Sequence, residues 1–186
     1  MKKMSIILGI IMLLVIAMFI FVISGAFSVF MPKPLEPEIK HGEFPIEVTC
    51  SINGVNHRTS DVIICDYAGV ESLGTAGKYR KWNSYLKSGN KHLIIVSDRK
   101  DEKNFEITID YGQAEYYMGD YELESKDDYE EKIMKSNYLG LYYFDEDGSV
   151  AESKTITYEQ ARNDFGIDAI DIQYSQPVSN KFERGK

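Results

Sequence analysis

The first 31 residues contain a long run without charge, and this run restricts the fold more than any other part of the sequence. Two lysines lie among residues 1–4, and residues 5–31, SIILGIIMLLVIAMFIFVISGAFSVFM, carry no charged side chain. About 20 consecutive apolar residues span the hydrocarbon core of a bilayer, and a longer run crosses it with some tilt. We therefore expect residues 1–31 to be an N-terminal transmembrane anchor that crosses from Ile6 to about Phe27.

The charges that flank this run indicate its orientation. Lys2 and Lys3 precede it, whereas the lysines of residues 32–42 are interspersed with acidic residues. Because Lys and Arg are enriched on cytoplasmic flanks, we expect a single-pass cell-membrane protein with a cytoplasmic N-terminus and an extracytoplasmic C-terminal domain. The alternative is a signal peptide cleaved near Ala26, since residues 24–26 place small side chains at the positions that signal peptidase reads. The rest of the chain would then be secreted.

The remaining sequence divides into a spacer, one domain and a tail. Residues 32–42, PKPLEPEIKHG, contain three prolines and form an extended spacer. Residues 43–175 have the size and the apolar content of a single domain with its own core. Residues 176–186 are a polar tail. The net charge of −8 opposes binding to nucleic acid, so we exclude this class of partner.

Alternating apolar residues predict several strands in the domain. Residues 44–52 alternate as a half-buried strand does, and Asn53-Gly54 is typical of a two-residue hairpin turn. A return strand over 55–59 and a buried strand over 61–67 follow. Further strands are expected at residues 93–97, 105–111, 138–144 and 167–174, the first two as a hairpin.

Two or three helices complete the predicted architecture. Ser125 is a candidate N-cap for a helix over residues 125–137, and Thr157, Gln160 and Gly166 match a capping box and a C-terminal glycine for residues 157–166. Residues 78–91 are the third candidate, because Tyr79, Trp82, Tyr85 and Leu86 fall at intervals of three and four. The expected fold class is α+β, with a mainly antiparallel sheet after the transmembrane helix.

Two cysteines, Cys50 and Cys65, raise the question of a disulfide. An extracytoplasmic pair oxidises readily, but a tight hairpin at Asn53-Gly54 would place Cys50 opposite His57 and away from Cys65. A disulfide and two separate buried thiols therefore both remain open.

The segment KYRKWNSYLKSGNK, residues 78–91, is the candidate partner-binding site. It holds five basic residues and no acid in an otherwise acidic chain, together with the only tryptophan. One interpretation is a helix whose aromatic face packs on the sheet. The other is a recognition surface for an anionic component or another protein, with an aromatic ring that stacks on a sugar or peptide. Its candidate residues are Lys78, Tyr79, Arg80, Lys81, Trp82 and Lys87.

Other chemistry is not indicated by the sequence. Gly69 and Gly74 have the spacing of a phosphate-binding loop, but Thr75 stands where that motif needs lysine. Residues 145–149, DEDGS, match only the start of a calcium loop and are expected to be a hairpin turn. The three histidines form no recognisable catalytic or metal-binding pattern. We expect no metal, no cofactor and no enzymatic activity.

A resemblance in three short stretches supports the same picture. The stretches GKYRKWNSYLKSGN, AEYYMGDYE and FPIEVTCSING look similar to uncharacterised membrane-anchored or secreted bacterial proteins. The resemblance implies a location in a bacterial cell envelope and no particular chemistry. The leading hypothesis is a membrane protein that presents a non-enzymatic binding domain. The alternative is an envelope hydrolase acting on carbohydrate or peptide.

Overall fold

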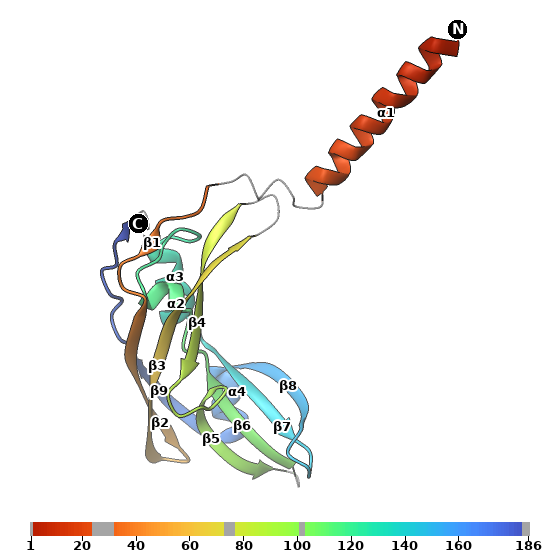
Figure 1. Ribbon diagram of the computed structural model, residues 1–186. Helices are drawn as coiled ribbons and strands as arrows, with labels where there is room; N and C mark the ends of the chain where they lie inside the picture. Colours follow the sequence, from red (N-terminus) through yellow and green to blue (C-terminus); the bar gives the residue numbers. More distant parts are fainter. Residues whose placement is uncertain (1, 24–31, 73–76, 101–102, 184–186) are drawn as a thin grey trace. The chain divides into compact units, whose positions relative to one another are not determined.

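The structure is a computed structural model that describes residues 2–23, 32–72, 77–100 and 103–183 (Figure 1). The chain divides into two compact units. The first comprises Met1–Glu36, Ala68–Lys81 and Phe182–Lys186, and the second comprises Pro37–Tyr67 and Trp82–Lys181. The core and the cavities discussed below belong to the second unit.

Two four-stranded antiparallel sheets dominate the fold (Figure 1). The first has the order β4-β3-β2-β9 and is built from β2 (His41–Ile52), β3 (Val55–Ser72), β4 (Lys78–Leu86) and β9 (Ile167–Gln173). The second has the order β5-β6-β7-β8 and is built from β5 (Leu93–Lys100), β6 (Lys103–Ile109), β7 (Tyr138–Phe144) and β8 (Val150–Thr157). Two short strands, β1 (Glu36–Pro37) and β10 (Phe182–Glu183), pair with each other.

The helices are α1 (Lys2–Ile23), α2 (Ala114–Tyr117), α3 (Lys126–Met134) and α4 (Tyr158–Phe165). The caps expected from the sequence are confirmed. Ser125 and Asp128 form a capping box at the start of α3, and Thr157 and Gln160 form one at the start of α4. Gly166 ends α4 in the left-handed conformation, with φ of 66°.

The hairpin predicted at Asn53-Gly54 is also confirmed. Both residues have positive φ, 51° and 81°, as a type I′ turn requires. The resulting register places Cys50 opposite His57, as expected. The return strand is longer than predicted, because β3 continues without interruption to Ser72. The predicted hairpin of β5 and β6 is present, and β9 follows α4 as expected.

The α+β fold class is wrong: the described chain is mostly β, with two antiparallel sheets. The largest single error is residues 78–91, where a strand replaces the expected helix. In β4 the buried positions are Arg80, Trp82 and Leu86, which alternate with more exposed neighbours. A period of two places alternate side chains on one face of a sheet, so this segment packs as a strand.

The expected transmembrane helix is contradicted as well. Among the residues that the structure describes, no helix is both long enough and apolar enough to cross a membrane. The cleavage motif near Ala26 falls in residues 24–31, which lie outside the described residues.

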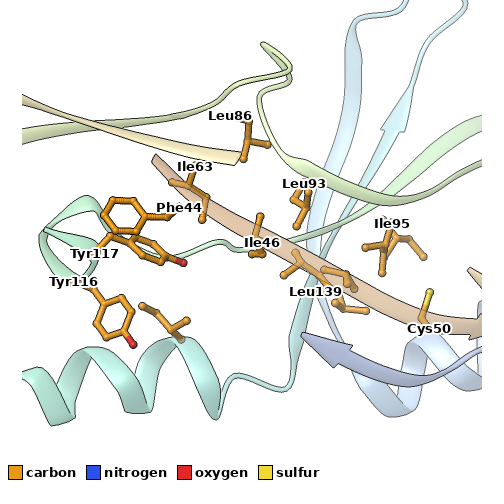
Figure 2. Close-up of a cluster of buried hydrophobic side chains, with 14 of the residues drawn as sticks. Phe44, Ile46, Cys50, Ile63, Leu86, Leu93, Ile95, Tyr116, Tyr117 and Leu139 are labelled. Atoms are coloured by element: carbon orange, nitrogen blue, oxygen red, sulfur yellow. The ribbon is translucent and has the colours of Figure 1, made fainter. Parts of the chain in front are cut away.

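The core of the second unit lies along the inward face of β2 (Figure 2). Phe44 and Tyr117 pack with ring centroids 5.0 Å apart, and Tyr116 contacts Tyr117 edge to face at 5.1 Å. These rings close one end of the cluster. Residues from both sheets complete it, among them Ile46, Ile63, Leu86, Leu93, Ile95, Ile107, Leu139 and Leu141.

Candidate functional site

The basic residues at the start of β4 contact their own unit. Arg80 is 7% exposed, its guanidinium donates a hydrogen bond of 3.2 Å to the carbonyl of Leu35, and it lies 4.1 Å from the ring centroid of Phe182. Nζ of Lys81 lies 2.9 Å from a carboxylate oxygen of Glu71. Lys78 and Tyr79 are half-buried. Arg80 is thus buried, and Lys81 forms an ion pair with Glu71.

Trp82 belongs to the core of the second unit. It is 7% exposed, its indole nitrogen donates a hydrogen bond of 2.9 Å to Oδ2 of Asp120, and its ring meets Tyr67 edge to face at 5.3 Å. Asp120 is itself 3% exposed. A buried ring with these contacts offers no flat face to a sugar or peptide.

Lys87 is the candidate residue that lies at a concave surface. Its exposed side chain forms an ion pair of 2.8 Å with Glu43, and this ammonium lowers the pKa of the Glu43 carboxyl. Lys87 also lines a groove of about 730 Å³. The lining residues of this sheet groove come from three strands of the first sheet, β2, β3 and β9, from the turn after β4 and from the segment after β9. Its lining residues are Pro45, Ile46, Glu47, Ser60, Asp61, Val62, Lys87, Ser88, Gln173, Tyr174 and Ser175.

The charged residues of the sheet groove are engaged by the protein itself. The hydroxyl of Ser88 donates to Oδ2 of Asp61 at 2.5 Å, and the backbone N–H of Val62 donates to Oδ1 at 2.7 Å. Glu47 accepts a short hydrogen bond from the guanidinium of Arg58. With Lys87 paired to Glu43, each of the three charged lining residues has a partner of its own chain.

A chain of polar contacts that was missed by sequence reasoning joins His41, Asp66 and Tyr85. Nδ1 of His41 donates a hydrogen bond of 2.7 Å to Oδ1 of Asp66, and the hydroxyl of Tyr85 donates one of 2.8 Å to Oδ2. These two hydrogen bonds lower the pKa of the Asp66 carboxyl. His41 was assigned to the spacer, yet it begins β2. Counting back along the hairpin from Asn53-Gly54 pairs His41 with Asp66 and would have found the contact.

The two cysteines are free thiols. In the β2–β3 register Cys65 lies opposite Gly42, whereas Cys50 is eight residues further along β2. Eight residues of strand span about 26 Å, far beyond the Cα separation of about 7 Å that a disulfide allows. Burial raises the pKa of Cys65 to about 12 and also raises that of Cys50.

The glycine-rich stretch and the acidic turn are the remaining motifs considered in the sequence. Gly69 and Gly77 have positive φ, and the residues between Ser72 and Gly77, including Gly74 and Thr75, lie outside the described residues. Lys78 begins a strand, so the helix that a phosphate-binding loop requires does not follow. Residues 145–149 form the expected hairpin turn between β7 and β8. No group of three or more His, Cys, Asp or Glu within the described ranges is arranged to hold a metal ion.

No protein-family model, no curated protein and no solved structure matches this chain. The resemblance to uncharacterised envelope proteins therefore stays a prediction.

Proposed function

We propose that the protein is a non-enzymatic binding module that holds an uncharged polar segment of a partner protein in the sheet groove. One observation carries this proposal. The groove is lined by residues of three strands, β2, β3 and β9, and by the turn after β4, and its three charged lining residues are already paired within the chain. Its volume of about 730 Å³ is within the range of about 300–1,000 Å³ that is typical of ligand sites.

The lining residues favour a polar ligand without net charge. Ser60 and Gln173 supply hydroxyl and amide groups that both donate and accept hydrogen bonds. A charged ligand would have to displace an existing pair such as Lys87–Glu43, whereas an uncharged peptide segment would leave these pairs intact. Binding should therefore depend little on salt, in contrast to binding driven by charge complementarity.

A hydrolase acting on carbohydrate or peptide is the alternative. A glycosidase of the common type needs two facing carboxyls, one of them protonated near neutral pH. Burial raises the pKa of Glu115, but Glu115 lies on α2 and does not line the groove. The two carboxylates of the groove, Glu47 and Asp61, are held by Arg58 and Ser88. The groove supports binding better than hydrolysis. The location outside the cytoplasm stays a prediction from the sequence.

Selection of peptides tests the proposal. Displayed random peptides are selected on the immobilised full-length chain, and the affinity of enriched peptides is then measured against two variants. Ser60→Arg fills the groove from an exposed position of β3. Asn56→Arg is the matched control, because Asn56 is also exposed, lies on the same strand at the same parity, and does not line the groove.

The expected result is a loss of at least about tenfold in affinity with Ser60→Arg and none with Asn56→Arg, a difference of about 1.4 kcal/mol or more. Lys87→Ala is expected to weaken binding less than Ser60→Arg does. Lys87 contributes surface to the groove but forms no ion pair with an uncharged ligand. Equal binding by both arginine variants, or the enrichment of no peptide, would overturn the proposal. Cleavage of the enriched peptides would favour the hydrolase.

A further inference from the structure

A second cavity of about 400 Å³ lies elsewhere in the second unit and shares no residue with the sheet groove. It lies where β4 and the segment before β5 meet β6 and β7. We call it the ring pocket, and it is lined by Ser84, Lys91, His92, Thr108, Ile109, Asp110, Tyr111, Gly112, Gly140 and Tyr142.

Two aromatic rings form one wall of the ring pocket. His92 stacks on Tyr142 with ring centroids 4.7 Å apart and an angle of 23° between the planes. This close stack leaves no slot between the rings for a third flat ring. A ligand can instead lie against the wall that the pair presents to the cavity, and such a wall is apolar over the ring faces and polar at the edges.

Gly140 keeps this wall open. A Cβ atom at this position would lie 2.6 Å from the hydroxyl oxygen of Thr108 and 3.0 Å from the ring of Tyr142. The first distance is shorter than real Cβ contacts and the second is tighter than most of them, so a side chain here would cover the hydroxyl and the ring. Glycine leaves both groups open to the cavity.

The polar groups around the rings include both donors and acceptors. Thr108 is 3% exposed and lines the cavity, and its hydroxyl can both donate and accept a hydrogen bond. A ligand that exchanges a hydrogen bond with this hydroxyl would gain affinity from the contact. Asp110 uses Oδ1 to accept from the backbone N–H of Gly112 at 2.9 Å, and Lys91 adds an ammonium. One cation and one carboxylate give the lining no net charge.

We propose that the ring pocket binds a neutral sugar ring. The faces of a pyranose carry C–H groups that pack against aromatic rings. Its equatorial hydroxyls can exchange hydrogen bonds with the hydroxyl of Thr108 and donate to the carboxylate of Asp110. The lack of net charge in the lining disfavours sugar phosphates and acidic sugars. The volume is near the lower end of the range for small-molecule sites, which suits one or two rings. This proposal does not depend on the function of the sheet groove.

Titration of the full-length chain with sugars, followed by NMR, tests the proposal. The probes are glucose, galactose, N-acetylglucosamine and cellobiose, and uridine represents a flat heteroaromatic ligand. Thr108→Val removes the hydroxyl and keeps the shape of the side chain. Asp110→Asn removes the charge, and Asp147→Asn is its matched control. Asp147 accepts from the backbone N–H of Ser149 two residues later, as Asp110 does from Gly112, but it does not line the pocket.

The expected result is that at least one of the sugars shifts the resonances of His92, Thr108 and Tyr142, with uridine weaker. Thr108→Val should then reduce the affinity by about 3- to 10-fold and Asp110→Asn by about 10-fold, which are the effects of losing a neutral and a charged hydrogen bond. Asp147→Asn should leave the affinity unchanged, and Thr108→Val should leave the melting temperature unchanged. The absence of shifts with every sugar would overturn the proposal, and so would stronger binding of uridine or equal losses in the two asparagine variants.

Discussion

The indole nitrogen of Trp82 donates a hydrogen bond of 2.9 Å to Oδ2 of Asp120, and both side chains are almost fully buried. The bond joins β4 to the segment that follows α2, 38 residues further along the chain. The chain's only tryptophan is therefore part of the core of the second unit. A residue expected at a contact surface instead fixes a strand to its neighbours.

Loss of this contact should destabilise the protein. We expect Trp82→Ala to lower the free energy of unfolding by about 3–5 kcal/mol, because it removes a large buried ring. Trp82→Phe keeps most of the apolar surface but removes the indole donor from a buried carboxylate, and we expect a loss of about 1–3 kcal/mol. Denaturant unfolding measures both. Tyr138→Phe at an exposed position of β7 is the control, and a Trp82→Ala variant as stable as this control would contradict a buried role.

The two thiols should remain reduced under oxidising conditions. Their positions along β2 and β3 hold them too far apart to bond, and burial raises the pKa of both thiols. We expect thiol-specific alkylation to be slow in the native protein and to modify both cysteines after unfolding. The melting temperature should be the same with and without reductant. A fall in the melting temperature on reduction would show that a disulfide forms.

Gly166 joins the end of α4 to the β2–β3 turn, and a side chain there should be costly. Gly166 has φ of 66°, its carbonyl accepts a hydrogen bond of 2.9 Å from the backbone of Asn53, and an added Cβ would clash with the Asn53 carboxamide. We expect Gly166→Ala to cost about 1–2 kcal/mol from the left-handed conformation alone, plus the displacement of Asn53.

Gly148 provides the control for this substitution. Its φ is 80°, and an added Cβ would meet no atom within 4 Å. Gly148→Ala should therefore show the conformational cost without the clash. If thermal unfolding shows equal losses for the two alanine variants, the contact between Gly166 and Asn53 contributes nothing.

Local signals explain which parts of the fold the sequence predicts correctly. The Asn53-Gly54 turn and the caps at Ser125, Thr157 and Gly166 depend on residues within a few positions of each other. Such interactions need no distant contact, so a short stretch of sequence is enough to predict them.

The fold class could not be predicted, because distant contacts decide the state of residues 78–91. The spacing of the aromatic residues fits a helix. A strand is recognised by alternating apolar and polar residues, and the charged Arg80 at an inward position of β4 interrupts this pattern. The carbonyl of Leu35 and the ring of Phe182 satisfy this arginine, and they lie 45 and 102 residues away in the chain. A buried cation needs partners, and nothing in the neighbouring sequence indicates them.

The residues that line the sheet groove could not be predicted from the sequence either, apart from Lys87. Its lining comes from residues 45–47, 60–62, 87–88 and 173–175, which only the strand order brings together. The register of the predicted hairpin was sufficient to pair His41 with Asp66, however, and this contact gives a prediction about pH.

Asp66 should contribute to stability only above the pH at which its carboxylate forms. The hydrogen bonds from His41 and then Tyr85 lower the pKa of Asp66 below its ordinary value of 3.8. A lowered pKa in the folded state means that the contribution is present above about pH 3.8 and is lost as the pH falls through the lower folded value. Asp66→Asn should therefore be less stable than the wild type at neutral pH, and this difference should shrink as the pH falls below about 3.8.

Denaturant unfolding across pH 2–7 measures this difference. The effect should be modest, because the side chains of His41 and Asp66 are 57% and 38% exposed and solvent screens their interaction. Asp98→Asn on β5 is the control. The carboxylate of Asp98 accepts a hydrogen bond from the backbone N–H of the neighbouring residue, Arg99, whereas that of Asp66 accepts from two distant side chains. If the prediction holds, the stability difference between Asp66→Asn and the wild type is not the same at pH 2 and pH 7. Equal differences would show that the hydrogen bonds from His41 and Tyr85 do not stabilise the carboxylate of Asp66.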